Sequence, residues 1–188
     1  MAIFFTSDLH LGHANIVRLC NRPFADVGEM DSALIQNWNT TVGHDDDVWV
    51  LGDFAFRNAR SVDDYLRRLK GRKHLVHGNH DSVKARISQE WSSSQPMAET
   101  IVDGVPLTLL HYAMRTWPRS GHGSIHLYGH SHGNLPGDRQ SCDVGVDCWD
   151  FRPVSLQEIR LRLATLPERG SSRRRHFHLT CMTAHNNL

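Results

Sequence analysis

Gly78-Asn79-His80-Asp81 is the stretch that decides the fold. It follows a short apolar run, Lys73 to His77, that is typical of a buried strand, and a helix-compatible stretch, Ser82 to Ser88, comes after it. The four residues are therefore expected on a strand-to-helix turn, where glycine at position 78 allows a tight backbone path.

The side chains of this turn suit a metal-assisted reaction. Asn79 offers a neutral oxygen to a metal ion, and His80 carries an imidazole, the side chain that gains and loses a proton near neutral pH. Asp81 is expected to hold that imidazole in one tautomer. Alone, the His80-Asp81 pair would be more typical of a surface turn than of a site, so its meaning depends on the rest of the chain.

The first half of the chain alternates strands and helices. This alternation argues for an α/β sheet with crossover helices. The helix after Ser61 is expected to open with a capping box at Ser61-Val62-Asp63-Asp64 and to close at Gly71. The predicted elements are a strand at 3–7, a helix at 15–20, a helix at 29–40, a strand at 48–51, a helix from 61 and the strand at 73–77.

The second half is richer in strands. Asp103-Gly104 lies between two strand-like runs, 100–102 and 105–110, and predicts a hairpin with a type I′ turn. Further strands are expected at 125–128 and 142–149, and a last helix is expected to begin with a capping box at Ser155. Both halves fit an α/β (α+β) fold of two mixed sheets packed face to face with helices outside.

Composition sets the broad class. The 188 residues suffice for one domain, expected over residues 1–167, and residues 168–188 read as a disordered basic tail. A formal net charge of +1 gives no electrostatic case for non-specific DNA binding or membrane adhesion. The four cysteines form no C-x-x-C pair and are expected to be reduced thiols of a cytoplasmic protein, although a Cys142–Cys148 bridge stays open. No run is long enough for a membrane span.

The 14 histidines are the unusual feature of the composition. Several of them, with two aspartates and an asparagine, come just after a predicted strand. The carboxyl ends of the strands of an α/β sheet lie on one side, where ligands bind. Seven oxygen and nitrogen donors would then converge, which is too many for one ion and suits two with a shared carboxylate. These donors are Asp8, His10, Asp53, Asn79, His111, His130 and His132.

The ordered blocks resemble those of the calcineurin-like metallophosphoesterase superfamily. The blocks are Asp8-x-His10, Gly52-Asp53, Gly78-Asn79-His80-Asp81, His111 and Gly129-His130-x-His132. Within that superfamily, residues 6–16 followed by 20–24 are most similar to the small single-domain bacterial and phage phosphoesterases. The resemblance implies the four-layer metallophosphoesterase sandwich, and it covers residues 3 to 132.

The resemblance also implies roles for the seven donors. One ion would be held by Asp8, His10, Asp53 and His132, and the other by Asp53, Asn79, His111 and His130. Asp53 would bridge two ions roughly 3.5–4 Å apart, which hold a hydroxide that attacks the phosphorus atom. His80 would meet the phosphate or protonate the leaving oxygen, with Asp81 orienting it. Mn²⁺ is expected, although Fe, Zn, Ni or Co also suits such donors.

The expected function is metal-dependent hydrolysis of a phosphodiester or a phosphomonoester. The runner-up within this class is a nuclease or cyclic-nucleotide phosphodiesterase acting on a nucleotide or an RNA end. Expected substrate contacts are His13, Asn15, Arg22 and Arg57. Trp117 would either stack on a base or cover the edge of a sheet.

Two readings of other classes stay open. A scaffold that kept the fold and lost catalysis would show gaps among the ligands, and this chain shows none. A structural zinc protein would need a four-ligand Cys/His cluster, which the spacing does not provide.

Overall fold

The computed structural model describes residues 1–56 and 61–169. Arg57, and all but the first two residues of the predicted tail at 168–188, lie outside the described residues. In the described part of the chain no helix is long and apolar enough to cross a membrane.

The first sheet has five strands in the order β4-β3-β2-β1-β9. Its strands are β1 (Ile3–Thr6), β2 (Asp47–Val50), β3 (Arg72–Val76), β4 (Ser93–Gln95) and β9 (Val154–Ser155). The pairing is parallel except between β9 and β1. Thr6 lies opposite Val50, and Val50 lies opposite Leu75, so β1, β2 and β3 end together. The loops that leave these three strands therefore emerge side by side.

The second sheet has four strands in the order β5-β6-β7-β8. They are β5 (Ala98–Val102), β6 (Val105–Leu109), β7 (Ile125–Tyr128) and β8 (Ser141–Asp143). The β5–β6 pair is antiparallel and the other pairs are parallel. Asp103 and Gly104 both have positive φ, 49° and 76°, which confirms the predicted type I′ hairpin.

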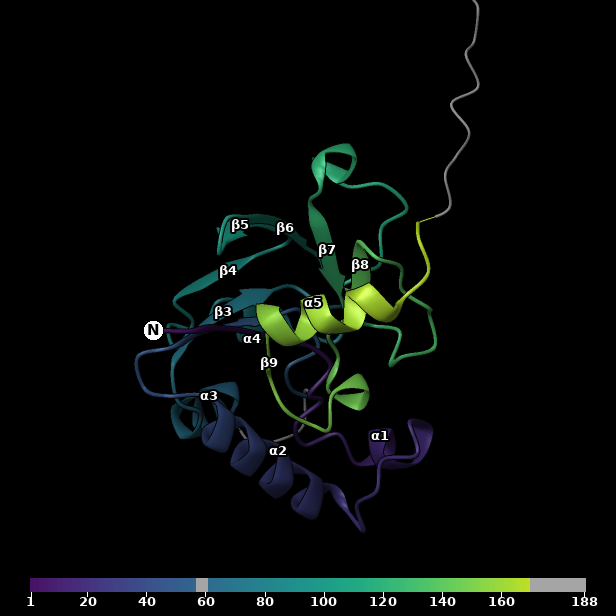
Figure 1. Ribbon diagram of the computed structural model, residues 1–188. Helices are drawn as coiled ribbons and strands as arrows, with labels where there is room; N and C mark the ends of the chain where they lie inside the picture. Colours follow the sequence, from purple (N-terminus) through teal and green to yellow (C-terminus); the bar gives the residue numbers. More distant parts are fainter. Residues whose placement is uncertain (57–60, 170–188) are drawn as a thin grey trace, which may run out of the picture.

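The helices and sheets enclose two hydrophobic cores. The helices are α1 (Ala14–Leu19), α2 (Val27–Thr41), α3 (Val62–Arg68), α4 (Val83–Arg86) and α5 (Leu156–Thr165). One core lies between the first sheet and α1, α2 and α3, around the fully buried Trp38. The other lies between the two sheets and is closed at one side by α5 (Figure 1), whose Ile159 is fully buried. The predicted fold class of two mixed, face-to-face sheets with flanking helices is confirmed.

The outer face of the second sheet is covered by the loop at 112–124. Trp117 of this loop donates its Nε1–H to the Ser124 carbonyl and packs on His126, with ring centroids 5.3 Å apart. His126 is fully buried, and its ring nitrogens bond to the Thr108 carbonyl and the Met114 amide at 3.0 Å each. Trp117 thus packs on the face of the second sheet, over the inner strand β7, rather than on the sheet edge that was one of its two predicted places.

Local differences from the sequence prediction have physical reasons. Ser155 does form a capping box with Glu158, but Ser61 makes no side-chain cap. The reciprocal bond is also disfavoured, because the third helical residue, Asp64, is one methylene shorter than glutamate and lies 3.8 Å from Arg67 instead. The strand expected at 142–149 stops at Asp143, and a 3-10 turn over Val146–Cys148 follows.

The edge strands β4 and β9 were not predicted from the sequence. Both are short, and β4 consists of polar residues without apolar alternation. Cys142 and Cys148 are free thiols, as is Cys20, so the Cys142–Cys148 bridge that was left open is absent from the described residues.

Candidate metal centre

The seven predicted donors lie at one edge of the two sheets. Asp8 and His10 follow β1, Asp53 follows β2, Asn79 follows β3, His111 follows β6, and His130 and His132 follow β7. The structure brings them together as two neighbouring groups.

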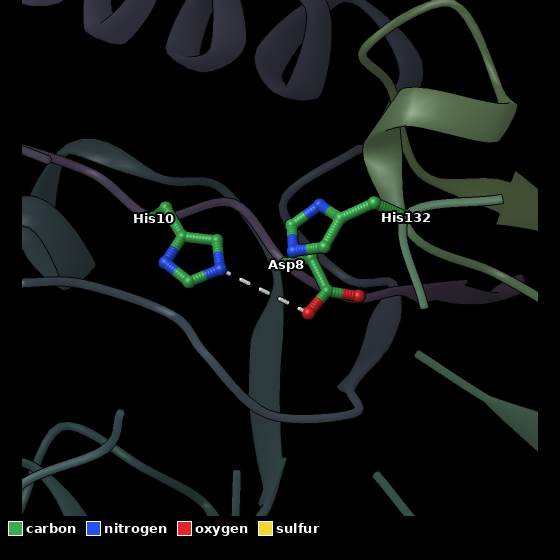
Figure 2. A group of neighbouring side chains, drawn as sticks. All are labelled: Asp8, His10 and His132. Atoms are coloured by element: carbon green, nitrogen blue, oxygen red, sulfur yellow. Dashed lines mark ion pairs between the residues drawn. The ribbon is translucent and has the colours of Figure 1, made fainter. Parts of the chain in front are cut away.

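The first group consists of Asp8, His10 and His132, whose donor atoms all lie within 4.8 Å of one another. Figure 2 shows both imidazoles directed into the same space beside the Asp8 carboxylate, with His10 Nε2 4.0 Å from Asp8 Oδ1. Among the described residues these two atoms are buried and have no hydrogen-bond partner. Because unpaired buried polar atoms are costly, their meeting point fits a cation.

The second group consists of Asp53, His111 and His130, whose donor atoms also lie within 4.8 Å of one another. His111 Nδ1 is 2.7 Å from the Leu51 carbonyl oxygen, which can only accept, so this nitrogen carries a proton. In a neutral ring His111 Nε2 then has a lone pair, and it lies 3.0 Å from Asn79 Oδ1 and 3.4 Å from Asp53 Oδ2. Three acceptor atoms at such distances suit a cation between them.

Asp53 joins the two groups. Its Oδ2 atom lies 3.6 Å from His10 Nε2 and 3.4 Å from His111 Nε2. Ligands bound at 2.0–2.2 Å to a common metal ion are roughly 2.8 to 3.6 Å apart, so both distances fit a ligand set. One carboxylate oxygen is thus placed to serve both groups.

Without a bound metal ion, burial shifts the pKa values of the donor side chains. It raises the pKa of the Asp8 carboxyl to about 7 and lowers the pKa of His10 to about 3. Burial also acts to raise the pKa of Asp53, but protonated His111, which can donate from Nε2 when no cation is bound, outweighs it and brings that pKa to about 2. The charged form of Asp8 is therefore unfavourable without a positive partner, and a divalent cation would supply one.

Comparison with known proteins agrees with this geometry. The calcineurin-like phosphoesterase superfamily domain matches residues 1–146. The chain belongs to this superfamily. The family is metal-dependent, and the substrate class that it implies is a phosphate ester.

The relatives cover most of the chain. An uncharacterized protein of Methanocaldococcus jannaschii is 33% identical over 168 residues, with 84% of this chain and 88% of the relative covered. The Gene 66 protein of Mycobacterium phage L5 is 29% identical, with 83% and 91% covered. A solved structure of a protein of unknown function from Aquifex aeolicus has a TM-score of 0.67 and 22% identity, with 86% and 98% covered, and it shows the shared fold alone.

The Asp81 side chain holds the backbone of the turn at 78–81 in place and does not orient the His80 ring. Its carboxylate accepts hydrogen bonds from the backbone N–H groups of Gly78 at 2.8 Å, Asp53 at 3.0 Å and Phe54 at 3.0 Å. These bonds tie the β3 turn to the loop after β2. The predicted role of Asp81, to orient the imidazole of His80, is corrected by this geometry.

Arg22 is not available to a substrate. Its guanidinium is buried and makes a bidentate pair with Asp147 at 2.8 Å, and it also donates to the carbonyls of Leu9 and Asp8. Asp147 in turn lies 2.7 Å from His132 Nδ1. The expected contact of Arg22 with a phosphate oxygen is therefore corrected to a contact inside the protein.

His80 and His13 flank the first group. The His80 ring lies 5.3 Å from the His10 ring, and its backbone N–H donates to Asp53 Oδ1 at 2.8 Å. His13 stacks on Phe56 at 4.1 Å, and its Nδ1 is 3.4 Å from His10 Nδ1. Asn15 is exposed on α1 and makes no hydrogen bond with the described residues of the cluster.

Two aspartates of the site were missed by the sequence analysis. Asp147 holds His132, and Asp143 fixes the loop that carries it by accepting from Ser131 Oγ at 2.6 Å and the Gly133 amide at 3.0 Å. The only signal for them is their place after β7 in the chain, because neither belongs to a recognisable block.

The ligand loops use an uncommon backbone conformation. A positive φ occurs at five of the seven donors: Asp8 (57°), His10 (52°), Asp53 (55°), His130 (66°) and His132 (47°). Asp, Asn and His adopt this region more readily than most residues, but it still costs free energy. Backbone strain of this kind is typical of functional sites, and here it turns consecutive loops toward one point.

Gly52 shows how closely these loops pack, and Gly52→Ala is expected to destabilise the protein. Its φ is +90°, and an added Cβ would lie 2.6 Å from both Gly78 Cα and His111 Nδ1. We expect a loss of about 1–3 kcal/mol in unfolding free energy from this overpacking, in addition to backbone strain, measured by urea unfolding.

Gly104→Ala is the matched control for this substitution. Gly104 has a similar φ of +76° but no atom within 4 Å of an added Cβ, so it reports backbone strain alone, about 1–2 kcal/mol. Equal losses in the two variants would show that the close approach at Gly52 costs nothing.

Proposed function

We propose that this protein hydrolyses a phosphate ester with a hydroxide activated by two divalent ions. Asp8, His10, Asp53 and His132 would hold one ion, and Asp53, Asn79, His111 and His130 the other. The observation that carries the proposal is the position of Asp53 Oδ2, 3.6 Å from a nitrogen of one group and 3.4 Å from a nitrogen of the other. When bound, such ions supply a nucleophile near neutral pH and fixed positive charge for the phosphoryl oxygens.

The residues of the chain have separate tasks in this proposal. The carbonyl of Leu51 and the carboxylate of Asp147 accept from the Nδ1 atoms of His111 and His132, so the Nε2 lone pairs of both rings are left for ligation. Asp53 Oδ1 accepts from the His80 amide and thereby fixes the turn that presents the imidazole. His80 binds the phosphate or donates a proton to the leaving oxygen.

The ions follow from the donor set. Imidazole, carboxylate and amide donors suit Mn²⁺, Fe, Zn, Ni or Co, and we propose Mn²⁺ on the resemblance to the small phosphoesterases. The substrate we propose is a phosphodiester or monoester of small size, such as a nucleotide or an RNA end. His13 lies beside His80, with ring centroids 6.2 Å apart, and is proposed as a substrate contact. Asn15 and Arg57 stay predictions.

The proposal is tested by removing and restoring metal. The chelated protein should have no activity on a nitrophenyl phosphodiester, and two equivalents of Mn²⁺ per chain should restore it. Adding Mg²⁺ at the same concentration controls for ionic strength and for weak oxygen-ligated ions.

Other outcomes separate the alternatives. A reconstituted protein that binds no ions would support a scaffold without catalysis. Two bound ions without turnover on aryl esters, cyclic nucleotides and short RNA would contradict the enzymatic proposal. Turnover confined to cyclic nucleotides or RNA would favour the nuclease or cyclic-nucleotide reading over a general phosphoesterase.

A further inference from the structure

Three largely buried polar side chains, Arg22, Asp147 and His132, contact one another in series next to the first donor group, Asp8, His10 and His132. The guanidinium of Arg22 pairs through Nε and Nη2 with the two oxygens of Asp147 at 2.8 Å each. Asp147 Oδ2 also lies 2.7 Å from His132 Nδ1. The side chains of Arg22, Asp147 and His132 are 0%, 9% and 17% exposed, so water screens these contacts little.

This series of contacts sets the tautomer of His132. A carboxylate oxygen can only accept, so the proton of His132 lies on Nδ1 and the lone pair of the neutral ring lies on Nε2. Such a carboxylate makes the ring a better ligand and fixes its orientation. The ring is directed into the space beside Asp8 (Figure 2).

The Arg22 guanidinium also donates hydrogen bonds to the backbone at Asp8, another member of the first donor group. Arg22 Nη2 donates to the Asp8 carbonyl at 2.7 Å, and Nη1 donates to the Leu9 carbonyl at 3.0 Å. Asp8 has a φ of 57°, a conformation that needs support from its surroundings. Arg22 therefore connects the backbone of one predicted ligand to the imidazole of another.

We propose that Arg22 and Asp147 are positioning residues of the first cation site. They act through the Asp8 backbone and the His132 ring, and neither touches the cation or the substrate. This inference rests on the proposed function, since it needs a cation at Asp8, His10 and His132. Asp147 lies just beyond residues 1–146, the range that matches the family, so the match does not assign it.

A third cation site is the competing explanation of this cluster. Donor atoms of Cys20, His132 and Asp147 lie within 4.8 Å of one another. However, both oxygens of Asp147 are bonded to the Arg22 guanidinium, whose positive charge lies against that point. Arg22 disfavours a cation there and leaves the carboxylate the role of an acceptor for His132.

The Asp147→Asn variant tests the proposal. The metal-free protein is titrated with Mn²⁺, and isothermal titration calorimetry measures the affinity for each ion. The asparagine keeps the shape and an acceptor oxygen but removes the charge that makes His132 a stronger ligand. We expect the affinity for one ion to fall roughly tenfold to a hundredfold, with the affinity for the other ion within about twofold of wild type. Glu158→Gln is the matched control, because it removes the charge from the Arg152–Glu158 pair at the start of α5, outside the donor groups, while glutamine can still serve the Ser155 capping box, and it should change neither affinity.

A second measurement distinguishes positioning from general stability. In the Zn²⁺-loaded protein, the ¹⁵N shifts of His132 should report protonated Nδ1 and ligated Nε2 in the wild type, with a shifted Nδ1–H resonance in Asp147→Asn. If Asp147→Asn leaves Arg22 unpaired and does not fold, Arg22→Met/Asp147→Asn removes both charges and should show the same selective loss.

Each outcome decides the proposal. Unchanged affinities for both ions, or equal weakening of both together with a lower melting temperature, would overturn the positioning role while leaving the proposed function in place. A wild-type protein that binds no ion beside Asp8 would overturn both. Three bound ions in the wild type, with one lost on Cys20→Ser, would show that the cluster is a third cation site.

Discussion

Asp53→Asn is expected to weaken the binding of both metal ions and to lower kcat/KM by about a thousandfold or more. The Oδ2 atom of Asp53 lies within 3.6 Å of a nitrogen from each donor group, so its negative charge acts on both. An ion stabilises the charge of the transition state by several kcal/mol, and about 4 kcal/mol corresponds to a thousandfold in rate. Metal content after dialysis and kcat/KM at saturating Mn²⁺ measure the two effects.

Asp47→Asn is the control for this variant. Asp47 lies at the other end of β2 and pairs with Arg72 at 2.7 Å on a partly exposed edge. Its substitution should leave two ions bound and the rate unchanged. If Asp53→Asn also kept two ions at wild-type affinity, Asp53 would not bridge the two groups and the proposed dinuclear site would be wrong.

The fold and the donor cluster were predictable because their signals are local. Apolar runs of four or five residues that end in Asp, Gly or His mark each central strand and the loop after it, as at Gly52-Asp53. The alternation with helices implies parallel strands, and parallel strands place their following loops on one side. Seven donors scattered from Asp8 to His132 could therefore be placed together without knowledge of any contact.

The supporting contacts were not predictable because they join distant residues. Arg22 and Asp147 are separated by 125 positions, and no local pattern distinguishes this pair from surface residues. The same holds for the His130 N–H that donates to Asp8 Oδ2 at 2.8 Å across 122 positions. Arginine in a loop near a phosphate site suggests a substrate contact, but burial and a carboxylate partner decide otherwise.

Asp81 was misassigned for a related reason. Its neighbour in the sequence is His80, and adjacency suggested that the two side chains interact. On this turn the Asp81 carboxylate points inward to three backbone N–H groups, two of which belong to the loop after β2. The direction of the Asp81 side chain depends on backbone N–H groups of the loop after β2 that need an acceptor, and the sequence does not reveal them.

His80→Ala is expected to leave both ions bound while lowering turnover by roughly 10²- to 10⁴-fold for substrates with poor leaving groups. The His80 ring is 5.3 Å from His10 but is not a member of either donor group in the described residues. Its backbone N–H, which donates to Asp53 Oδ1, is kept by alanine, so the ligand turn should stay in place. An alkyl ester needs a proton on the leaving oxygen, whereas nitrophenolate leaves without one, so the nitrophenyl ester should lose far less rate.

His74→Ala controls for the loss of an imidazole elsewhere in the same sheet. His74 of β3 bonds to Ser93 of β4 and to Asp47 of β2 and lies outside the donor groups, so its removal should change neither metal content nor the ratio of alkyl to nitrophenyl rates. That ratio is the deciding measurement for His80. A uniform loss for both esters would mean that His80 binds the phosphate group rather than protonating the leaving oxygen, and a loss of metal would make it a ligand.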